Sequence, residues 1–371
     1  MSSSAPLKRS PLHQFHLNAR AKMADFGGWE MPIEYPQDSG GGVINEHNAT
    51  RESVALFDVS HLGKAEVAGE GSLEFLNSCL TSDLAKIEDG QAQYTMLCDP
   101  VTAGVVDDLI VYRKSQREFL MVPNAANTQE VVDRLSRSAP DGVIVKNCHE
   151  DFGVIALQGQ KAKQVLEDLG VELELDYMSF TSAEIKGKTV VICRTGYTGE
   201  FGFEILPEWS DAPLIWDVLL GSVKGQGGLV AGLGARDTLR TEMGYPLHGH
   251  ELSLGITPVQ AAAGWAIGWN KREFWGKDKL LSEKETGPAR ILRGLILQER
   301  GIPRAGMQVY SSGSQVGETT SGTFSPTLKV GIALALIDPR VKVGDEISVD
   351  IRGKRVPAKV VKPPFVPSRV R

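Results

Sequence analysis

The spacing of apolar residues divides the chain into an early part that mixes helices with strands and a later part made of short strands. Up to about residue 270, segments with apolar positions at helical spacing alternate with segments of strand-like alternation. The predicted helices cover 43–57, 72–79, 127–136, 162–169 and 212–220, and the predicted strands cover 57–67, 92–97, 105–112, 118–122, 152–157 and 189–194. Because no βαβ unit repeats, the pattern predicts an α+β fold.

The later part changes character after Trp275. Short strands divided by Gly and Pro are predicted at 293–298, 308–311, 315–320, 332–337, 346–351 and 355–362. A helical connector is expected near 276–288. The sequence therefore predicts a separate small β-barrel from about residue 290.

Composition places the chain among ordinary globular proteins. With 371 residues, of which 42% are hydrophobic and 23% charged, two or three packed domains are expected. No apolar run reaches the roughly 18 residues that a membrane span needs. Residues 1–9 lack the apolar core of a signal peptide and are predicted to form a frayed tail.

Cysteine usage and charge narrow the possible classes of protein. Cys79, Cys98, Cys148 and Cys193 lie far apart and form no Cys-x-x-Cys pair, which favours buried free thiols in a reducing cytoplasm. The formal net charge of -6 argues against a general nucleic-acid binder.

The end of the chain is locally basic. Between residues 352 and 371 there are seven basic residues and no acidic one: Arg352, Lys354, Arg355, Lys359, Lys362, Arg369 and Arg371. Two interpretations stay open, a solvated edge strand with a tail, or a docking surface for an acidic partner or an anionic substrate tail.

Two adjacent acids interrupt the predicted strand 105–112. Neighbouring side chains on a strand face opposite sides, so one of Asp107 and Asp108 is expected to point inward. Burial would raise the pKa of that carboxyl and suit it to proton transfer with a nitrogen. The alternative is that both acids lie at a strand end and accept backbone N–H groups.

Two further segments combine glycines with polar residues. Segment 194–204 is either a ligand cradle or a Gly-rich hairpin, and it lacks the Gly-Lys-Ser/Thr ending of a phosphate loop. A predicted helix over 235–243 places Arg236 and Arg240 on one face, where they contact either an anion or neighbouring acids. His61, His248 and His250 are too few for a metal site, so no metal is predicted.

Seven motifs together resemble the aminomethyltransferases, or T-proteins, of the glycine cleavage system. In chain order they are Phe26-Gly-Gly-Trp-Glu-Met-Pro, Phe57-Asp-Val-Ser-His, Gly104-Val-Val-Asp-Asp-Leu, Leu157-Gln-Gly, Arg194-Thr-Gly-Tyr-Thr-Gly-Glu, Gly232-Leu-Gly-Ala-Arg-Asp and Thr320-Ser-Gly-Thr-Phe-Ser-Pro. The resemblance covers the chain from about residue 12 to its end.

The resemblance implies a three-domain cloverleaf around a central folate site, with the C-terminal β-barrel as its third leaf. The expected division is 1–52 plus 148–245 for a first α+β domain, 53–147 plus 246–275 for a second, and 285–371 for the barrel. Tetrahydrofolate would lie with its pteridine inside and its glutamate tail toward solvent.

The resemblance also implies roles for single residues. Asp108 matches the family's key carboxylate and is the predicted catalytic residue. The residues that fall where the family holds folate are Leu62, Tyr94, Asn124, Tyr197, Glu204 and Arg236. Arg236 is expected to pair with Asp108 or with the ligand. Leu62 stands where methionine is common, Gln160 replaces a usual proline, and Phe201 replaces a common acid.

The predicted activity is transfer of an aminomethyl group from the dihydrolipoyl arm of H-protein to tetrahydrofolate, which gives 5,10-methylenetetrahydrofolate and ammonia. Lipoylated H-protein is the expected partner, with no nucleic acid and no membrane. The alternatives are a tetrahydrofolate-dependent demethylase of the dimethylsulfoniopropionate type and a non-enzymatic folate-binding module.

Overall fold

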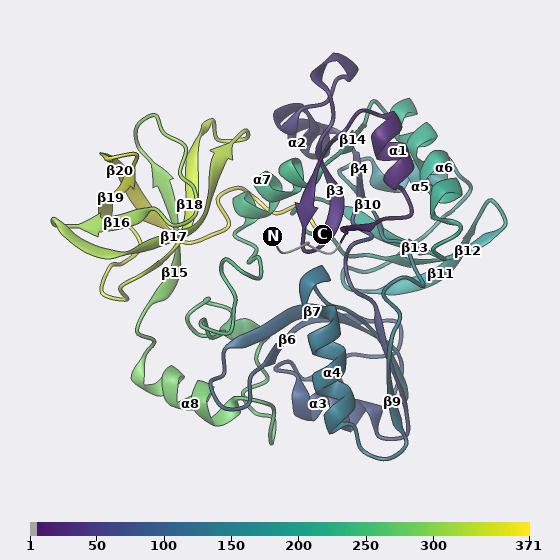
Figure 1. Cartoon of the computed structure of the whole chain (residues 1–371), viewed down its shortest axis with the longest axis horizontal. Helices are drawn as coiled ribbons and strands as arrows, with labels where there is room; N and C mark the ends of the chain where they lie inside the picture. The colour runs from purple at the N-terminus through teal and green to yellow at the C-terminus, as the bar shows by residue number, and fades with distance from the viewer. Residues whose placement is uncertain (1–5) are drawn as a thin grey trace.

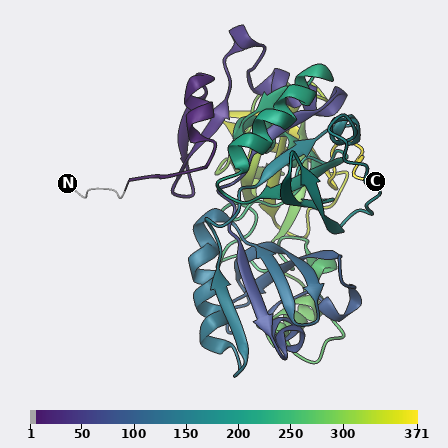
Figure 2. The same ribbon diagram turned by 90° about the vertical axis from the view of Figure 1, so that its right-hand side faces the viewer.

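Three units surround a common centre in the computed structural model, which describes residues 6–371 (Figure 1). A six-stranded sheet with its helices and a five-stranded sheet lie one above the other, and the β-barrel stands beside them (Figures 1 and 2). The helices are α1 (His13–Asn18), α2 (Val43–Glu52), α3 (Ser72–Cys79), α4 (Thr128–Ser138), α5 (Ala162–Glu167), α6 (Ala212–Gly225), α7 (Leu233–Met243) and α8 (Lys277–Thr286). This arrangement is the predicted cloverleaf.

The six-stranded sheet forms the first unit. Its order is β11 (Phe180–Ile185), β12 (Lys188–Cys193), β13 (Gly202–Pro207), β10 (Ile155–Gln158), β4 (Ala55–Asp58) and β14 (Leu229–Ala231). On one face, side chains of α5 and α6 such as Val165 and Trp216 pack on Leu56 and Ile205. β4 lies in this sheet, between β10 and β14, although the expected division assigns residue 53 onward to the second unit.

A small N-terminal sheet lies beside the first unit. It consists of β1 (Lys8–Arg9), β3 (Trp29–Glu34) and β2 (Lys22–Phe26) in that order. Gly27 and Gly28 both take positive φ angles of 61° and 85° at the turn between β2 and β3, a conformation that glycine adopts without strain. The turn sets Phe26 directly opposite Trp29.

The five-stranded sheet forms the second unit, in the order β6 (Ala92–Cys98), β7 (Val105–Ser115), β8 (Glu118–Val122), β5 (Ala65–Gly69) and β9 (Val143–Asn147). Leu76 of α3 and Leu135 of α4 pack on Val67 and Val111. On the other face, Tyr112 and Leu120 join Phe57 and Leu239 in an apolar cluster between the two sheets. The two units therefore share one interior.

The C-terminal barrel closes on itself. Its order is β15 (Ile291–Leu297), β18 (Val330–Ile337), β17 (Ser314–Ser325), β16 (Gln308–Ser311), β19 (Glu346–Ile351) and β20 (Lys354–Val361), and β20 pairs again with β15. β18 is apolar almost throughout because Ala333 and Ala335 fill the barrel while Leu334 and Leu336 pack outward on the segment 252–274.

The predicted pattern is confirmed for most elements and wrong for several others. The α+β fold with a closed barrel is confirmed, as are four buried free thiols. The N-terminal sheet, α1, β9, β11, β13 and β14 were not predicted, and the single strand predicted over 57–67 is wrong because β4 and β5 lie in different sheets. β20 is not an edge strand, because it is paired on both sides. The frayed tail predicted for residues 1–9 is wrong at Lys8–Arg9, which pair with β3, and residues 1–5 lie outside the described residues.

Candidate active site

The acid pair on β7 converges on one asparagine. Asn124 follows β8 and precedes a short 3-10 turn, Ala125–Asn127. Its Nδ2 donates to Asp107 Oδ1 at 2.9 Å and to Asp108 Oδ1 at 3.0 Å. Its backbone N–H donates to Asp107 Oδ2 at 2.9 Å. Asp107 is the acid that points inward, as expected for one of the pair, and one amide joins both carboxylates.

The two acids differ in what else they contact. Asp107 is fully buried and also accepts from Asn127 Nδ2 at 2.6 Å. Asp108 is half-buried, and its Oδ2 accepts from the Tyr94 hydroxyl at 3.0 Å. Asp107 thus has a donor at each oxygen and holds Asn124, whereas Asp108 faces the more open side.

Burial governs the protonation of this pair. Loss of solvent, followed by the charge of Asp108, raises the pKa of Asp107 to about 8. Loss of solvent also raises the pKa of Asp108, and the Tyr94 and Asn124 hydrogen bonds oppose it. Two carboxylates this close do not both ionise easily. The pair therefore keeps one proton at pH values well above the ordinary pKa of Asp.

Tyr94 on β6 links the acids to the surface. Its ring stacks on Trp265 with 5.3 Å between ring centroids, and Trp265 is 73% exposed. Burial raises the pKa of the Tyr94 hydroxyl, and the charge of Asp108 raises it further. The hydroxyl therefore stays protonated and acts as a hydrogen-bond donor to Asp108.

Tyr197 and Arg236 form a second group. Tyr197 lies in the loop between β12 and β13, and its hydroxyl donates to the Pro246 carbonyl. The Arg236 guanidinium, from α7, lies 4.4 Å from the centre of the Tyr197 ring. Within residues 6–371, Arg236 has neither an ion pair nor a side-chain hydrogen bond. An Arg236–Asp108 pair, one of the two predicted alternatives, is therefore not formed.

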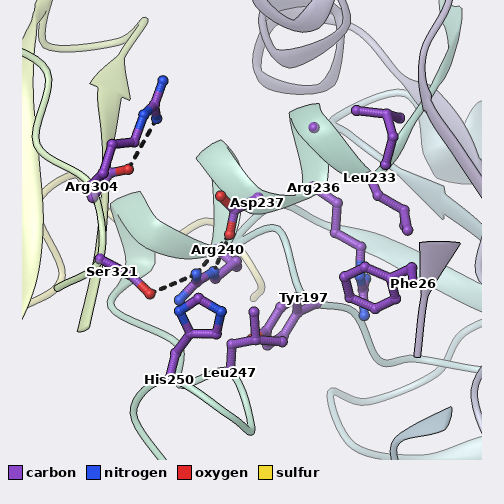
Figure 3. A pocket seen from close by; sticks show the side chains of 14 residues that line it. Phe26, Tyr197, Leu233, Arg236, Asp237, Arg240, Leu247, His250, Arg304 and Ser321 are labelled. Atoms are coloured by element: carbon purple, nitrogen blue, oxygen red, sulfur yellow. Dashed lines mark hydrogen bonds and ion pairs between the residues drawn. The ribbon is translucent and has the colours of Figure 1, made fainter. Parts of the chain in front are cut away.

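A cavity of about 530 Å³ opens beside this second group, between α7 and the barrel (Figure 3). Arg236 and Tyr197 lie on its wall with the apolar side chains of Phe26, Leu233 and Leu247. The opposite wall, from the barrel, carries Arg304, Ala305, Ser321 and Gly322. The cavity combines apolar walls with a guanidinium free to bind an acceptor, as small-molecule sites commonly do.

A buried ion pair borders the same cavity. Arg240 Nη1 donates to Glu251 at 3.0 Å, and its Nη2 donates to Ser321 Oγ at 2.8 Å. The predicted alternative of ion pairs with neighbouring acids holds for Arg240, which also bonds Asp237. Arg240 is thus fully satisfied by protein groups, unlike Arg236 on the same helix.

The remaining predicted residues line the interior near these groups. Glu204 on β13 is buried and accepts from Thr195 Oγ1 at 2.5 Å, and its charge acts on the pKa of Arg236. Leu62, in the turn after β4, packs in the apolar cluster between the two sheets. The charge of Asp108 also acts on Tyr197, which connects the two groups electrostatically.

Sequence reasoning overlooked several residues that the fold brings to this region. Asn127 supports Asp107, and Trp265 supports Tyr94, and neither was predicted as a site residue. Arg304 comes from the barrel, about 70 residues from the nearest site motif on α7. No spacing along the chain signals these contacts.

Comparison with known proteins gives a consistent result. A family profile described as the GCVT N-terminal domain matches residues 12–271, and one described as the glycine cleavage T-protein C-terminal barrel domain matches residues 290–367. An aminomethyltransferase from Parafrankia sp. is 58% identical over 366 residues, covering 98% of this chain and 99% of the relative. One from Mycobacterium tuberculosis is 52% identical over 373 residues, with both chains fully covered.

A solved structure extends the likeness to three dimensions. The crystal structure of glycine cleavage system aminomethyltransferase T from Bartonella henselae superposes with a TM-score of 0.90 at 36% identity. The superposed region covers 98% of this chain and 99% of the Bartonella henselae chain.

Proposed function

Given that the chain belongs to the glycine cleavage T-protein family, we propose that Asp108 is its catalytic carboxylate and that H-protein carries its one-carbon donor. The chain is an aminomethyltransferase of the glycine cleavage system, and tetrahydrofolate is its acceptor substrate. The observation that carries the proposal is the half-buried Asp108 carboxylate, joined to Tyr94 and Asn124 and able to take up a proton.

The reaction removes two protons from the folate nitrogens, and both must be taken up by the leaving groups. The aminomethyl carbon loses its bonds to nitrogen and sulfur and gains bonds to two folate nitrogens, whose protons leave with ammonia and the thiol. Tetrahydrofolate supplies those nitrogens. Asp108 is suited to orient one of them and to accept its proton. Its raised pKa lies closer to the pKa of a weakly basic amine, which favours the proton transfer.

The other predicted binding residues fit the rest of tetrahydrofolate. The Glu204 carboxylate can accept hydrogen bonds from the donor edge of a pteridine, and Leu62 offers apolar contact. Arg236, which lacks a protein acceptor within residues 6–371, is available to a ligand oxygen or ring. Tyr94, Asn124 and Tyr197 complete the proposed folate-binding set.

The donor would reach the site from the cavity beside α7. An aminomethyl-dihydrolipoyl arm is long and mostly apolar, which suits the walls formed by Phe26, Leu233 and Leu247. H-protein would therefore dock at the side of the molecule where the barrel meets α7. We further propose a cytoplasmic location, supported by the four unpaired thiols.

The test is formation of 5,10-methylenetetrahydrofolate from tetrahydrofolate and aminomethyl-loaded H-protein, with wild type and Asp108→Asn compared. We expect turnover to fall by about 100-fold or more in the variant, while tetrahydrofolate still binds. An Asp108→Asn enzyme with full activity would remove the catalytic role. Wild type that instead makes 5-methyltetrahydrofolate from dimethylsulfoniopropionate would support the demethylase alternative.

A further inference from the structure

The turn of residues 60–63, which carries Leu62, accepts hydrogen bonds from two buried basic side chains, those of Lys64 and His149. Lys64 Nζ donates to the carbonyl oxygens of Ser60 at 3.0 Å and Leu62 at 2.8 Å. His149 Nε2 donates to the carbonyl oxygen of His61, between them, at 2.8 Å. Three consecutive carbonyls are thus fixed by two side chains from outside the turn.

The lysine is unusual for its surroundings. Lys64 is fully buried, and within residues 6–371 it has no carboxylate within ion-pair distance. Its ammonium lies 5.6 Å from the Trp209 ring. Burial lowers the pKa of Lys64 to about 7, which measures the cost of keeping a charge there. The ammonium satisfies two carbonyls for which no other donor lies within hydrogen-bond distance in residues 6–371, and these hydrogen bonds offset that cost.

The turn also supports the acid pair. The Gly63 N–H donates to the Pro123 carbonyl at 2.8 Å, next to Asn124. A Cβ at Gly63 would lie 2.1 Å from Thr128 Oγ1, so the turn presses directly on the start of α4. Gly63 therefore anchors the end of the turn on the segment that carries Asn124.

His149 also supports the hairpin that carries Phe26 on the cavity wall. The His149 ring packs on Trp29 with 5.0 Å between ring centroids, and Trp29 is paired with Phe26 across the β2–β3 turn. Lys64 and His149 thus lie behind two surfaces, the turn with Leu62 and the hairpin with Phe26.

We propose that Lys64, together with His149, is a positioning residue that fixes the turn 60–62 and thereby holds Leu62 against bound tetrahydrofolate. The inference rests on the proposed folate-binding role of Leu62. The His149 hydrogen bond to the His61 carbonyl and the Lys64 hydrogen bond to the Leu62 carbonyl orient the peptide planes on the two sides of Leu62, and this orientation fixes the direction of its side chain.

The experiment measures tetrahydrofolate affinity by calorimetry, together with KM and kcat, for Lys64→Met. We expect the dissociation constant and KM to rise about tenfold with kcat within about twofold. Lys146→Met on β9, where the lysine is exposed, is the matched control and should leave all three unchanged. Unchanged affinity in folded Lys64→Met would overturn the proposal.

His149 provides an independent variant if Lys64→Met does not fold. His149→Phe keeps a ring against Trp29 but removes the donor, so affinity should fall, whereas His149→Gln retains an N–H donor and should recover part of it. Equal effects of the two substitutions would count against positioning.

A double-mutant cycle with Leu62→Ala tests the route of the effect. If Lys64 acts through Leu62, Lys64→Met should weaken binding much less in the Leu62→Ala background, whereas additive effects would contradict the proposal. Failure of wild type to use tetrahydrofolate at all would instead refute the proposed function.

Discussion

Asp107 and Asp108 are neighbours in sequence with separate tasks. Asp107 is enclosed and receives hydrogen bonds from Asn124 and Asn127, whereas Asp108 bonds Tyr94 and stays accessible. Burial raises the pKa of both groups, and the charge of Asp108 raises that of Asp107 further. Asp107 therefore influences the chemistry of Asp108 through charge as well as through Asn124.

The pH dependence of kcat should report this coupling. Because the pKa of Asp108 is raised, loss of activity on the acid side should begin above pH 4, the ordinary range of Asp. Because Asp107, whose pKa is raised to about 8, keeps its proton at these pH values, Asp107→Asn should leave the acid limb in place and abolish the change in kcat that ionisation of Asp107 causes near pH 8. A pH–rate profile of both enzymes provides the measurement, and identical profiles near pH 8 would show that the charge of Asp107 does not act on Asp108.

Helix α7 connects the site to the barrel through a buried carboxylate. Glu242 accepts from Ser325 Oγ at 2.5 Å and Thr327 Oγ1 at 2.9 Å of the barrel, and from Arg51 Nη2 of α2 at 2.8 Å. Burial alone would raise the pKa of Glu242, but His47, Ser325 and Arg51 lower it to about 2. This one side chain joins three segments.

Glu242→Gln should lower the free energy of unfolding, because it weakens the contacts between α7, α2 and the barrel. The substitution leaves Arg51 with a weaker partner, and breaking a buried ion pair costs about 3 kcal/mol. Since the folded pKa of Glu242 is depressed, its contribution is present above about pH 4.5 and is lost as pH falls toward 2.

Urea unfolding at several pH values measures this effect. The difference in unfolding free energy between wild type and Glu242→Gln should be largest at pH 7 and shrink below about pH 4.5. Glu346→Gln, at an exposed position of β19, is the control. An equal difference at pH 7 and pH 3 would exclude an ionised Glu242 as the cause.

At the scale of the whole molecule, the basic end of the chain is divided between two places. Arg352, Lys354, Arg355 and Lys359 lie on the barrel surface, while the last residues return to the first unit. There the Arg369 N–H donates to the Gly199 carbonyl, and Arg194 Nη2 donates to the Val370 carbonyl at 2.6 Å. Lys354 and Arg355 pair with acids of the barrel, whereas Arg352, Lys359 and Lys362 are exposed and form no ion pair among the described residues.

Charge reversal of Arg352 and Lys359 tests their role in donor docking. If they attract H-protein, the double variant should show a higher KM for H-protein at low salt, and the two enzymes should converge as salt screens the surface charges. Arg137→Glu on α4 of the second unit is the control. Identical salt dependence in wild type and the double variant would exclude this surface.

Local spacing along the chain determined many elements of this protein. The predicted bounds of α3, β8, β16 and β19 agree with the structure, because each has a regular apolar pattern between turn residues. The barrel follows from the same reasoning, and the ordered motifs identify the family. Strands such as β11 were not predicted, since its half-exposed residues alternate weakly.

The tertiary structure alone decided how the site is assembled. Asp107 and Asp108 should face opposite sides of a strand, yet the turn after β8 places Asn124 where it reaches both. Lys64 and His149 meet at one turn although 85 residues separate them in sequence. The apolar periodicity of a segment indicates which of its residues face the core. Contacts between distant polar side chains depend instead on how sheets and turns pack, and no local pattern predicts them.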